Sequence, residues 1–244
     1  MKIIQITDLH LSGPEDTPDS SDYNSWQRWS RLAEYIEKRK PDLIVNTGDI
    51  CLQNPQMSIY KKFFDSLKGF STPLRLVAGN HDDLSMLQSA LPAETATETK
   101  VDCEGFTCLF LDCENGRLIP SHQSLLFETL SSGSAPLILF MHYPPVYAGS
   151  PFMDQNYPFQ QIDTLLPAIK NANRPIHVFC GHYHTDRIIQ TGACNIYITP
   201  SPYKNIDPAF ETKTTAVDRG LPFREIHLNQ SIIQQELHYL PSKI

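Results

Sequence analysis

The middle of the chain contains the stretch Leu74-Arg75-Leu76-Val77-Ala78-Gly79-Asn80-His81-Asp82-Asp83, an apolar run of strand length followed by a glycine and a row of polar side chains. The amide, imidazole and carboxylate groups of that row do not favour a strand, and all of them can bind metal or phosphate. Open α/β sheets bind ligands just beyond the carboxyl ends of their strands. This stretch therefore predicts a strand that delivers ligand-binding groups to one edge of a sheet.

Other apolar runs of the chain end in the same way. The run Lys2 to Thr7 is followed by Asp8 and His10, Leu43 to Thr47 by Asp49, Leu137 to Met141 by His142, and Ile176 to Cys180 by His182 and His184. Each tail alone has an ordinary explanation, such as a loop hydrogen bond or, for Asn80, a helix cap. Because every run delivers only Asp, Asn or His towards what could be a single edge, the joint pattern indicates a site.

The chemistry of these tails favours metal ions. Asp8 and His10 lie two residues apart, as do His182 and His184, so an extended backbone points each pair the same way. Carboxylate and imidazole ligands without thiolates suit manganese, iron or zinc. The candidate ligands are too many for one such ion, whereas two ions that share a carboxylate need about this number.

The order of the predicted elements favours an α/β (α+β) fold with two mixed sheets. Helical spacing over 26–36, 56–67, 83–90, 121–130 and 160–170 alternates with the apolar runs, while 98–113 and the segments 195–199, 216–217, 223–228 and 231–239 resemble short strands and hairpins. Such βα units followed by hairpins imply two sheets flanked by helices. No linker interrupts residues 1–244, so we expect a single domain. The proline-rich segment 143–158 is expected to be a long, ordered and functional loop.

Composition limits the partners and the compartment. The chain has 244 residues, 41% of them hydrophobic, and a net charge of -7, which disfavours a nucleic-acid polymer as obligate partner. No run reaches the roughly 20 apolar residues of a membrane span, and the start does not resemble a signal peptide. The six cysteines are scattered without a CxxC pair, which is typical of free thiols in a reducing cytosol. We therefore expect a cytoplasmic protein with a small-molecule substrate; the oligomeric state stays open, a homodimer being possible.

Taken in order, these motifs resemble those of the calcineurin-like metallophosphoesterase family: Asp8-x-His10, Gly48-Asp49, Gly79-Asn80-His81-Asp82, His142 and Gly181-His182-x-His184. They span about three quarters of the chain, and as an ordered set they are highly specific. The resemblance implies a four-layer αββα sandwich, with two mixed β-sheets flanked by helices and a dinuclear metal site at the carboxyl-terminal edge of the strands. This fold agrees with the order of the predicted elements.

The resemblance also implies a role for each site residue. Asp8, His10 and His184 would hold one metal, Asn80, His142 and His182 the other, and Asp49 would bridge the two. A hydroxide shared by the ions would attack the phosphorus. His81 would not bind metal; with Asn80 it would donate hydrogen bonds to the substrate phosphate, and it is placed to protonate the leaving alkoxide.

Two loops narrow the subgroup. The second motif reads Gly48-Asp49-Ile50-Cys51-Leu52, unlike the Gly-Asp-x-x-Asp-Arg-Gly of phosphoprotein phosphatases. The loop from Phe140 to Pro145, and Thr199-Pro200-Ser201, are similar to class III cyclic nucleotide phosphodiesterases and related bacterial glycerophosphodiesterases. Tyr143 stands where these relatives usually have a second histidine, which bears on substrate contacts.

The expected function is that of a metal-dependent phosphodiesterase acting on a small diester, with 3′,5′-cyclic AMP as the first candidate. Glycerophosphodiesters, or other small diesters and monoesters, are the alternative within the same chemistry. A non-catalytic scaffold of the same fold is the alternative from another class, and the intact ligand positions favour catalysis over it. The aromatic candidates for stacking on a nucleobase lie in the proline-rich loop: Tyr147, Phe152 and Tyr157.

Overall fold

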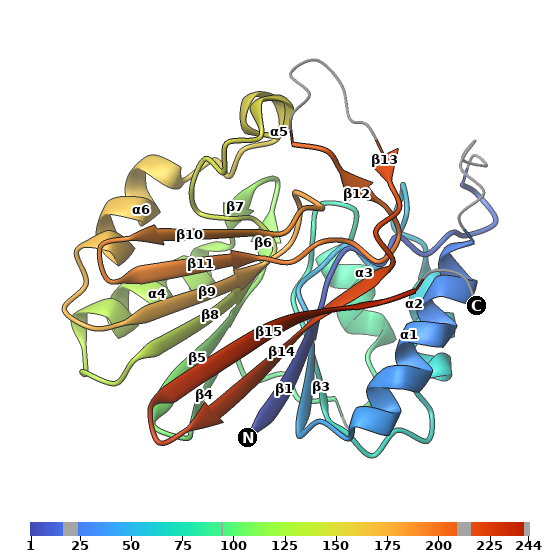
Figure 1. Ribbon diagram of the computed structural model, residues 1–244, viewed down its shortest axis with the longest axis horizontal. Coiled ribbons are helices and arrows are strands. Elements are labelled where there is room, and N and C mark those ends of the chain that lie inside the picture. The colour runs from blue at the N-terminus through green and yellow to red at the C-terminus, as the bar shows by residue number, and fades with distance from the viewer. Residues whose placement is uncertain (17–23, 94, 209–215, 242–244) are drawn as a thin grey trace.

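Two β-sheets lie face to face in the computed structural model of the protein, and helices cover the outer side of each sheet (Figure 1). The structure describes residues 1–16, 24–93, 95–208 and 216–241. Helices α1, α2 and α3 lie on the right in Figure 1, whereas α4 and α6 lie on the left. This arrangement confirms the four-layer αββα sandwich that the sequence predicts.

The first sheet is five-stranded, in the order β15-β14-β1-β2-β3. Its parallel centre consists of β1 (Lys2–Ile6), β2 (Leu43–Asn46) and β3 (Leu74–Leu76). A long antiparallel hairpin, β14 (Leu221–Asn229) and β15 (Ile232–Leu240), adds to β1. The first and last segments of the chain therefore share one sheet.

The second sheet is six-stranded, in the order β10-β11-β9-β8-β5-β4. Four strands run parallel, and the two edge strands run antiparallel to them. The bounds are β4 (Lys100–Cys103), β5 (Phe106–Leu111), β8 (Leu137–Met141), β9 (Ile176–Cys180), β10 (Arg187–Thr191) and β11 (Cys194–Ile198). Two small ribbons pair β6 (Cys113–Glu114) with β7 (Arg117–Leu118), and β12 (Asn205–Ile206) with β13 (Ala216–Val217).

The helices begin and end close to where the apolar spacing predicts. They are α1 (Ser25–Arg39), α2 (Met57–Ser66), α3 (Leu84–Ala90), α4 (Pro120–Ser131), α5 (Pro151–Asn156) and α6 (Ile162–Lys170). The cap of α1 is Asn24, whose side chain accepts a hydrogen bond from the Gln27 amide. The short α5 lies inside the segment expected to be a loop. Proline is tolerated at the first turn of a helix, so Pro151 starts α5 instead of preventing it.

Aromatic rings of the second sheet pack in the layer between the two sheets. In the layer between the sheets, the rings of Phe110, Phe140, Phe179 and Tyr197 stack in sequence with centroids 5.2, 5.6 and 4.8 Å apart. Each ring comes from a different strand of the second sheet, and Ile3 and Val45 of the first sheet belong to the same cluster. This packed layer gives the site a rigid support.

Candidate metal centre

The candidate metal-binding residues meet at one edge of the sandwich. Asp8, His10 and His184 offer ligand atoms that all lie within 4.8 Å of one another, and Asp49, His142 and His182 form a second such group. Asn80 joins the second group, because its Oδ1 lies 3.0 Å from His142 Nε2. These residues follow β1, β2, β3, β8 and β9, so both sheets supply the site.

The first group leaves one carboxylate oxygen facing two imidazoles. His184 Nε2 lies 3.0 Å from His10 Nε2 and 3.2 Å from Asp8 Oδ1. Among the described residues, nothing donates a hydrogen bond to the buried Asp8 Oδ1. The other oxygen, Asp8 Oδ2, accepts from the Thr7 hydroxyl at 2.7 Å and from the His182 amide at 2.9 Å. A buried oxygen without a donor, beside two ring nitrogens, fits a cation.

Asp49 lies between the two groups. Its Oδ2 is 3.7 Å from His10 Nε2 and 3.4 Å from His142 Nε2. Its Oδ1 accepts from the His81 amide at 2.8 Å, which fixes the carboxylate plane. One side chain thus contacts an imidazole of each group, as a carboxylate shared by two ions must.

Backbone carbonyls orient the imidazoles of both groups. His142 Nδ1 lies 2.9 Å from Thr47 O, His184 Nδ1 2.9 Å from Lys204 O, and His182 Nε2 2.9 Å from Tyr157 O. A carbonyl only accepts, so each of these ring nitrogens carries a proton, and in the neutral ring the other nitrogen presents a lone pair. His10 Nδ1 likewise faces a backbone carbonyl, Leu52 O, at 3.4 Å. Metal-ligating histidines are oriented in this manner.

The protonation states of Asp8, His10 and His182 suit metal binding. Burial, aided by the neighbouring His184, lowers the pKa of His10 to about 3, and burial beside His142 lowers the pKa of His182 to about 3. Burial alone would raise the pKa of Asp8, but His184 outweighs it and the pKa falls to about 2. His142 differs, because Asp49 outweighs burial and raises its pKa to about 9, so a metal ion held by His142 would have to replace the Nε2 proton. Neutral imidazoles and ionised carboxylates are the forms that bind metal.

Strained backbone brings the ligands together. Asp8, His10, Asp49, His182 and His184 all have positive φ angles, between 45° and 67°. Such left-handed conformations are uncommon for residues other than glycine and cluster at functional sites. Because the chain turns sharply at each of these residues, the side chains converge instead of continuing the strands.

Two glycines of the motifs are required by close approach. A Cβ added to Gly79 would lie 2.2 Å from Asp49 Oδ1, and one added to Gly181 would lie 2.2 Å from Asp8 Oδ2. Neither position has room for a side chain without displacing a carboxylate of the site. The glycines before Asn80 and His182 therefore serve the geometry of the ligands.

Asp82 connects two of the ligand loops. Its carboxylate accepts from the amides of Ile50, Cys51 and Gly79 and from the Tyr60 hydroxyl, at 3.1 to 3.3 Å. Ile50 follows Asp49, and Gly79 precedes Asn80. Burial, with the nearby charge of Asp49, raises the pKa of Asp82 to about 6. Asp82 thus stabilises the relative position of the two loops without contacting the centre.

Tyr143 lies outside the open part of the site. Its ring is buried, and its centroid lies 4.2 Å from that of His182 and 5.2 Å from that of His142. The residue that replaces the second histidine of the relatives therefore packs against two candidate ligands. It does not line the cavity over the metal centre.

A cavity of about 480 Å³ opens over the metal centre. Of the aromatic residues expected to stack on a base, Tyr157 lines it, whereas Phe152 packs against the core and Tyr147 is exposed elsewhere. Sequence reasoning missed Tyr203, Lys204 and Ile206, which form part of the wall. The only signal was the nearby Thr199-Pro200-Ser201, and Ser201 Oγ indeed donates to Asp8 O at 2.7 Å.

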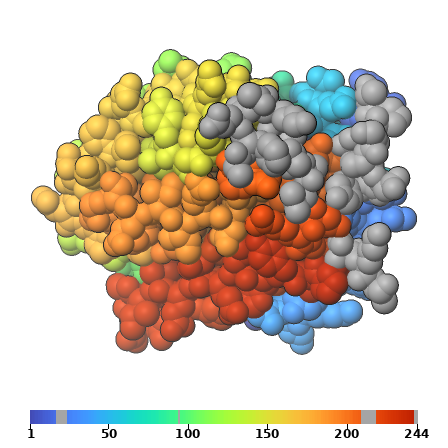
Figure 2. Space-filling view, turned by 45° about the horizontal axis from the view of Figure 1, so that its top comes forward, coloured from blue at the N-terminus to red at the C-terminus, as the bar shows by residue number. Residues whose placement is uncertain are grey.

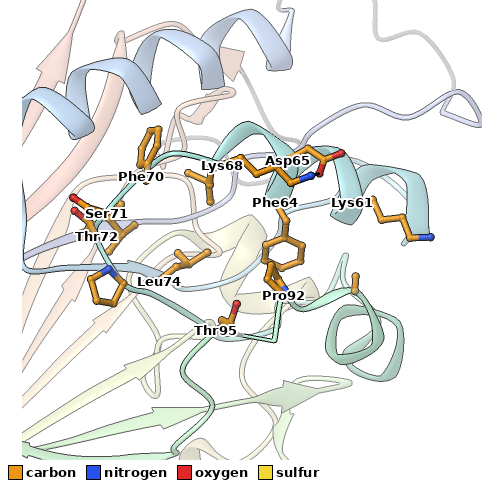
Figure 3. A pocket seen from close by; sticks show the side chains of 14 residues that line it. Lys61, Phe64, Asp65, Lys68, Phe70, Ser71, Thr72, Leu74, Pro92 and Thr95 are labelled. Atoms are coloured by element: carbon orange, nitrogen blue, oxygen red, sulfur yellow. Dashed lines mark ion pairs between the residues drawn. The ribbon is translucent and has the colours of Figure 1, made fainter.

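A second cavity, of about 490 Å³, lies between the end of α2, the segment 67–74 and the residues Ala90, Pro92 and Thr95 (Figure 3). Its lining is largely apolar, and the charged rim includes the exposed ion pair of Lys68 and Asp65 at 2.7 Å. No histidine is among the described residues that line it. The chemistry is therefore concentrated in the cavity over the metal centre.

Two further expectations concern the cysteines and the membrane. All six cysteines are free thiols, as the sequence predicts. In the part of the chain that the structure describes, no helix combines the length and the apolar character needed to cross a bilayer.

Comparison with known proteins identifies the family. The family model for calcineurin-like phosphoesterases matches residues 1–186. A 3′,5′-cyclic adenosine monophosphate phosphodiesterase of Vibrio vulnificus is 27% identical over 96% of this chain and 89% of its own length. A glycerophosphodiester phosphodiesterase of Enterobacter lignolyticus is 25% identical over 78% of this chain and 73% of its own.

A solved structure shares the fold. The dimetal phosphatase from Danio rerio superposes with a TM-score of 0.64 at 11% identity, covering 97% of this chain and 95% of that one. At this identity the likeness concerns the fold alone. The matched residues 1–186 include every motif from Asp8 to His184, which confirms the expected phosphoester-hydrolase family. The chain belongs to the calcineurin-like phosphoesterase family.

Proposed function

We propose that the protein hydrolyses small phosphodiesters with the help of two metal ions and that 3′,5′-cyclic AMP is its substrate. The observation that carries the proposal is the pair of ligand groups joined by Asp49 Oδ2, which lies 3.4 Å from His142 Nε2 and 3.7 Å from His10 Nε2. Family membership supports a phosphoesterase. Relatives named as phosphodiesterases at 25 to 27% identity support the diester.

The ligand groups assign the residues that would hold each ion. Asp8, His10 and His184 would hold one ion, Asn80, His142 and His182 the other, and Asp49 would contact both. Carboxylate, imidazole and amide donors suit iron, manganese or zinc. When bound, the two ions neutralise charge on the phosphoryl oxygens and lower the pKa of water at the site.

His81 differs from the candidate ligands by its exposure. The other histidines of the site are almost fully buried, whereas His81 is only half-buried and lines the cavity. Its Nδ1 lies 3.2 Å from Gln53 O, which leaves Nε2 to face a substrate. In its imidazolium form His81 would keep the Nδ1 proton on Gln53 O, pass the Nε2 proton to the leaving alkoxide and end as the neutral ring. Asn80 at the same wall would donate hydrogen bonds to the phosphate. His81 therefore acts as the general acid in this proposal.

The cavity wall favours an apolar, flat leaving group. Leu52, Met153 and Ile206 supply apolar surface, and Tyr157 and Tyr203 supply aromatic rings. A nucleoside can stack on such rings, whereas a glycerol moiety gains little from them. Glycerophosphodiesters remain the second candidate because a relative of similar identity bears that name. The free thiols support a cytoplasmic setting.

The test is a panel of substrates for the enzyme reconstituted in turn with manganese, iron and zinc. The panel compares kcat/KM for 3′,5′-cyclic AMP, glycerophosphocholine, bis-p-nitrophenyl phosphate and p-nitrophenyl phosphate. We expect cyclic AMP to exceed glycerophosphocholine by at least about tenfold, which corresponds to about 1.4 kcal/mol of transition-state binding. Turnover of glycerophosphocholine without turnover of cyclic AMP would replace the first candidate by the second.

A further inference from the structure

Among the residues that the structure describes, strand β15 is a long sheet edge with no strand paired on its outer side. It has nine residues and pairs with β14 without interruption, from Leu221 opposite Leu240 to Asn229 opposite Ile232. The other edges of the two sheets are shorter: β3 has three residues, β4 four and β10 five. Long open edges are templates for pairing with another chain.

The composition of β15 lacks the devices that usually protect an edge. Ile232 to Leu240 contains no lysine, arginine, proline or glycine, and Glu236 is its only carboxylate. Ile232 is 62% exposed and Tyr239 is 41% exposed. Figure 2 shows the β14–β15 hairpin, in dark red, as a continuous band on the surface. By contrast, the edge strands β4 and β10 carry Lys100, Asp102 and Arg187.

The turn of the hairpin shows which backbone groups of β15 point outward. Gln230 and Ser231 both have positive φ, 45° and 67°, which is the two-residue turn of a tight hairpin. In this hairpin Asn229 and Ile232 exchange hydrogen bonds, and the pattern then alternates. Pro222, which has no N–H, accordingly falls on a pair without hydrogen bonds, opposite Tyr239. The N–H and C=O groups of residues 233, 235, 237 and 239 therefore face away from β14.

We propose that β15 pairs antiparallel with β15 of a second copy of this chain, with the two-fold axis at Leu237, so that two five-stranded sheets become one continuous sheet. Residues whose backbone N–H and C=O face away from β14 must pair with the same kind of residue in the partner. The two-fold axis must therefore pass through a residue and not between two residues. An axis at Glu236 would place this carboxylate opposite its own copy, and like charges directly opposite are unfavourable. An axis at Leu237 places Glu236 opposite the partner's His238, and His238 opposite the partner's Glu236.

The axis at Leu237 also satisfies the outward backbone groups. Leu237 exchanges hydrogen bonds with its copy, and Gln235 exchanges them with the partner's Tyr239 on either side of the axis. Within one chain Glu236 Oε2 lies 3.6 Å from His238 Nε2, so the two side chains share a face of the sheet, with Glu236 exposed and His238 Nε2 buried. His238 also stacks on the ring of Phe223, with the two ring centroids 5.0 Å apart. A strand pair of this length without a large apolar contact makes a weak dimer, in the micromolar range.

The test is sedimentation velocity of the full chain over about 1 to 200 μM, with charge variants of β15. We expect dimer formation that increases with concentration. His238→Glu, which sets carboxylates opposite each other twice, should raise the dimer dissociation constant at least about tenfold. Glu236→Lys combined with His238→Glu should restore it, because lysine then faces glutamate. Gln190→Glu on the β10 edge is the matched control and should leave the dimer unchanged.

Three results would overturn the proposal. A wild-type chain that stays monomeric at 200 μM excludes the edge as an interface. If the double variant has as high a dimer dissociation constant as His238→Glu, the register with the axis at Leu237 is excluded. A disulfide-linked dimer of Glu236→Cys excludes it as well, because the two copies of residue 236 lie opposite each other only when the axis is at Glu236. If His238→Glu does not fold, Tyr239→Pro replaces it as the test. This substitution removes the outward N–H of residue 239, which lies opposite Pro222 and makes no hydrogen bond to β14. It should weaken the dimer while the melting temperature stays close to that of the wild type.

Discussion

Replacing Asp82 by alanine should separate the two ligand loops without touching a ligand. The carboxylate of Asp82 accepts four hydrogen bonds, from the amides of Ile50, Cys51 and Gly79 and the hydroxyl of Tyr60. The alanine variant leaves these donors without their acceptor. Of the contacts between the loop that begins at Asp49 and the loop that carries Asn80, the His81 amide bond to Asp49 Oδ1 remains, but those through Asp82 are lost. The second metal site should therefore weaken more than the first.

The size of the effect follows from the number and type of these bonds. Hydrogen bonds to charged groups contribute about 1.5–3 kcal/mol each, but water reaches this half-buried site and replaces part of them. We expect a loss of about 3 kcal/mol in the free energy of unfolding, comparable with removal of one partner of a buried network. For a chain of this size that is a fall in Tm of roughly 6–12 °C.

The assay combines thermal unfolding with metal titration at a temperature where the variant is folded. Asp83→Ala is the matched control, because the neighbouring Asp83 caps α3 through the Met86 amide at 2.7 Å and does not bridge the loops. It should cost about 1 kcal/mol and leave metal affinity unchanged. The reasoning fails if Asp82→Ala melts within about 2 °C of wild type and keeps both metal affinities.

Three further substitutions test separate parts of the site. His81→Ala should keep both metals and lower kcat for cyclic AMP by about 10²–10⁴-fold, with a smaller loss on bis-p-nitrophenyl phosphate; equal losses would mean that His81 only positions the phosphate. Tyr143→Ala should cost about 3–5 kcal/mol of stability and weaken the metal that His182 holds, while Tyr143→Phe keeps both; calorimetric metal titration measures the difference. Tyr157→Ala should reduce kcat/KM for cyclic AMP by roughly 5- to 150-fold and spare bis-p-nitrophenyl phosphate, since a base stack contributes about 1–3 kcal/mol; a matching loss on both would exclude stacking.

The sequence predicts the strands and the ligands because both signals are local. A buried strand is a short apolar run. His142 follows such a run directly, and His182 and Asp49 follow one within two and three residues. The glycine before Asn80 likewise predicts the turn that ends the strand. The strand β10 was missed because Arg187 to Thr191 is half-exposed and only partly apolar, so it lacks the apolar run that marks the central strands.

The wall of the cavity could not be predicted, because contacts between distant residues place it. Tyr203 and Lys204 reach the site because Ser201 bonds to Asp8 O and because Arg28 Nε donates to Pro202 O, across 193 and 174 residues. Similarly, Phe152 packs against the core instead of lining the cavity, in a loop that Asp154 holds together by accepting hydrogen bonds from the amides of Ala148 and Ser150. No local pattern carries this information.

The central claim is that Asp49 serves two metal ions at once, and metal analysis of purified protein tests it most directly. The wild-type chain, reconstituted with manganese and freed of excess metal, should retain about two ions and hydrolyse bis-p-nitrophenyl phosphate. Asp49→Ala should lose both ions and the activity together, because the same carboxylate lies against His10 and His142. Two tightly held ions in Asp49→Ala, or full wild-type activity with a single ion, would contradict it.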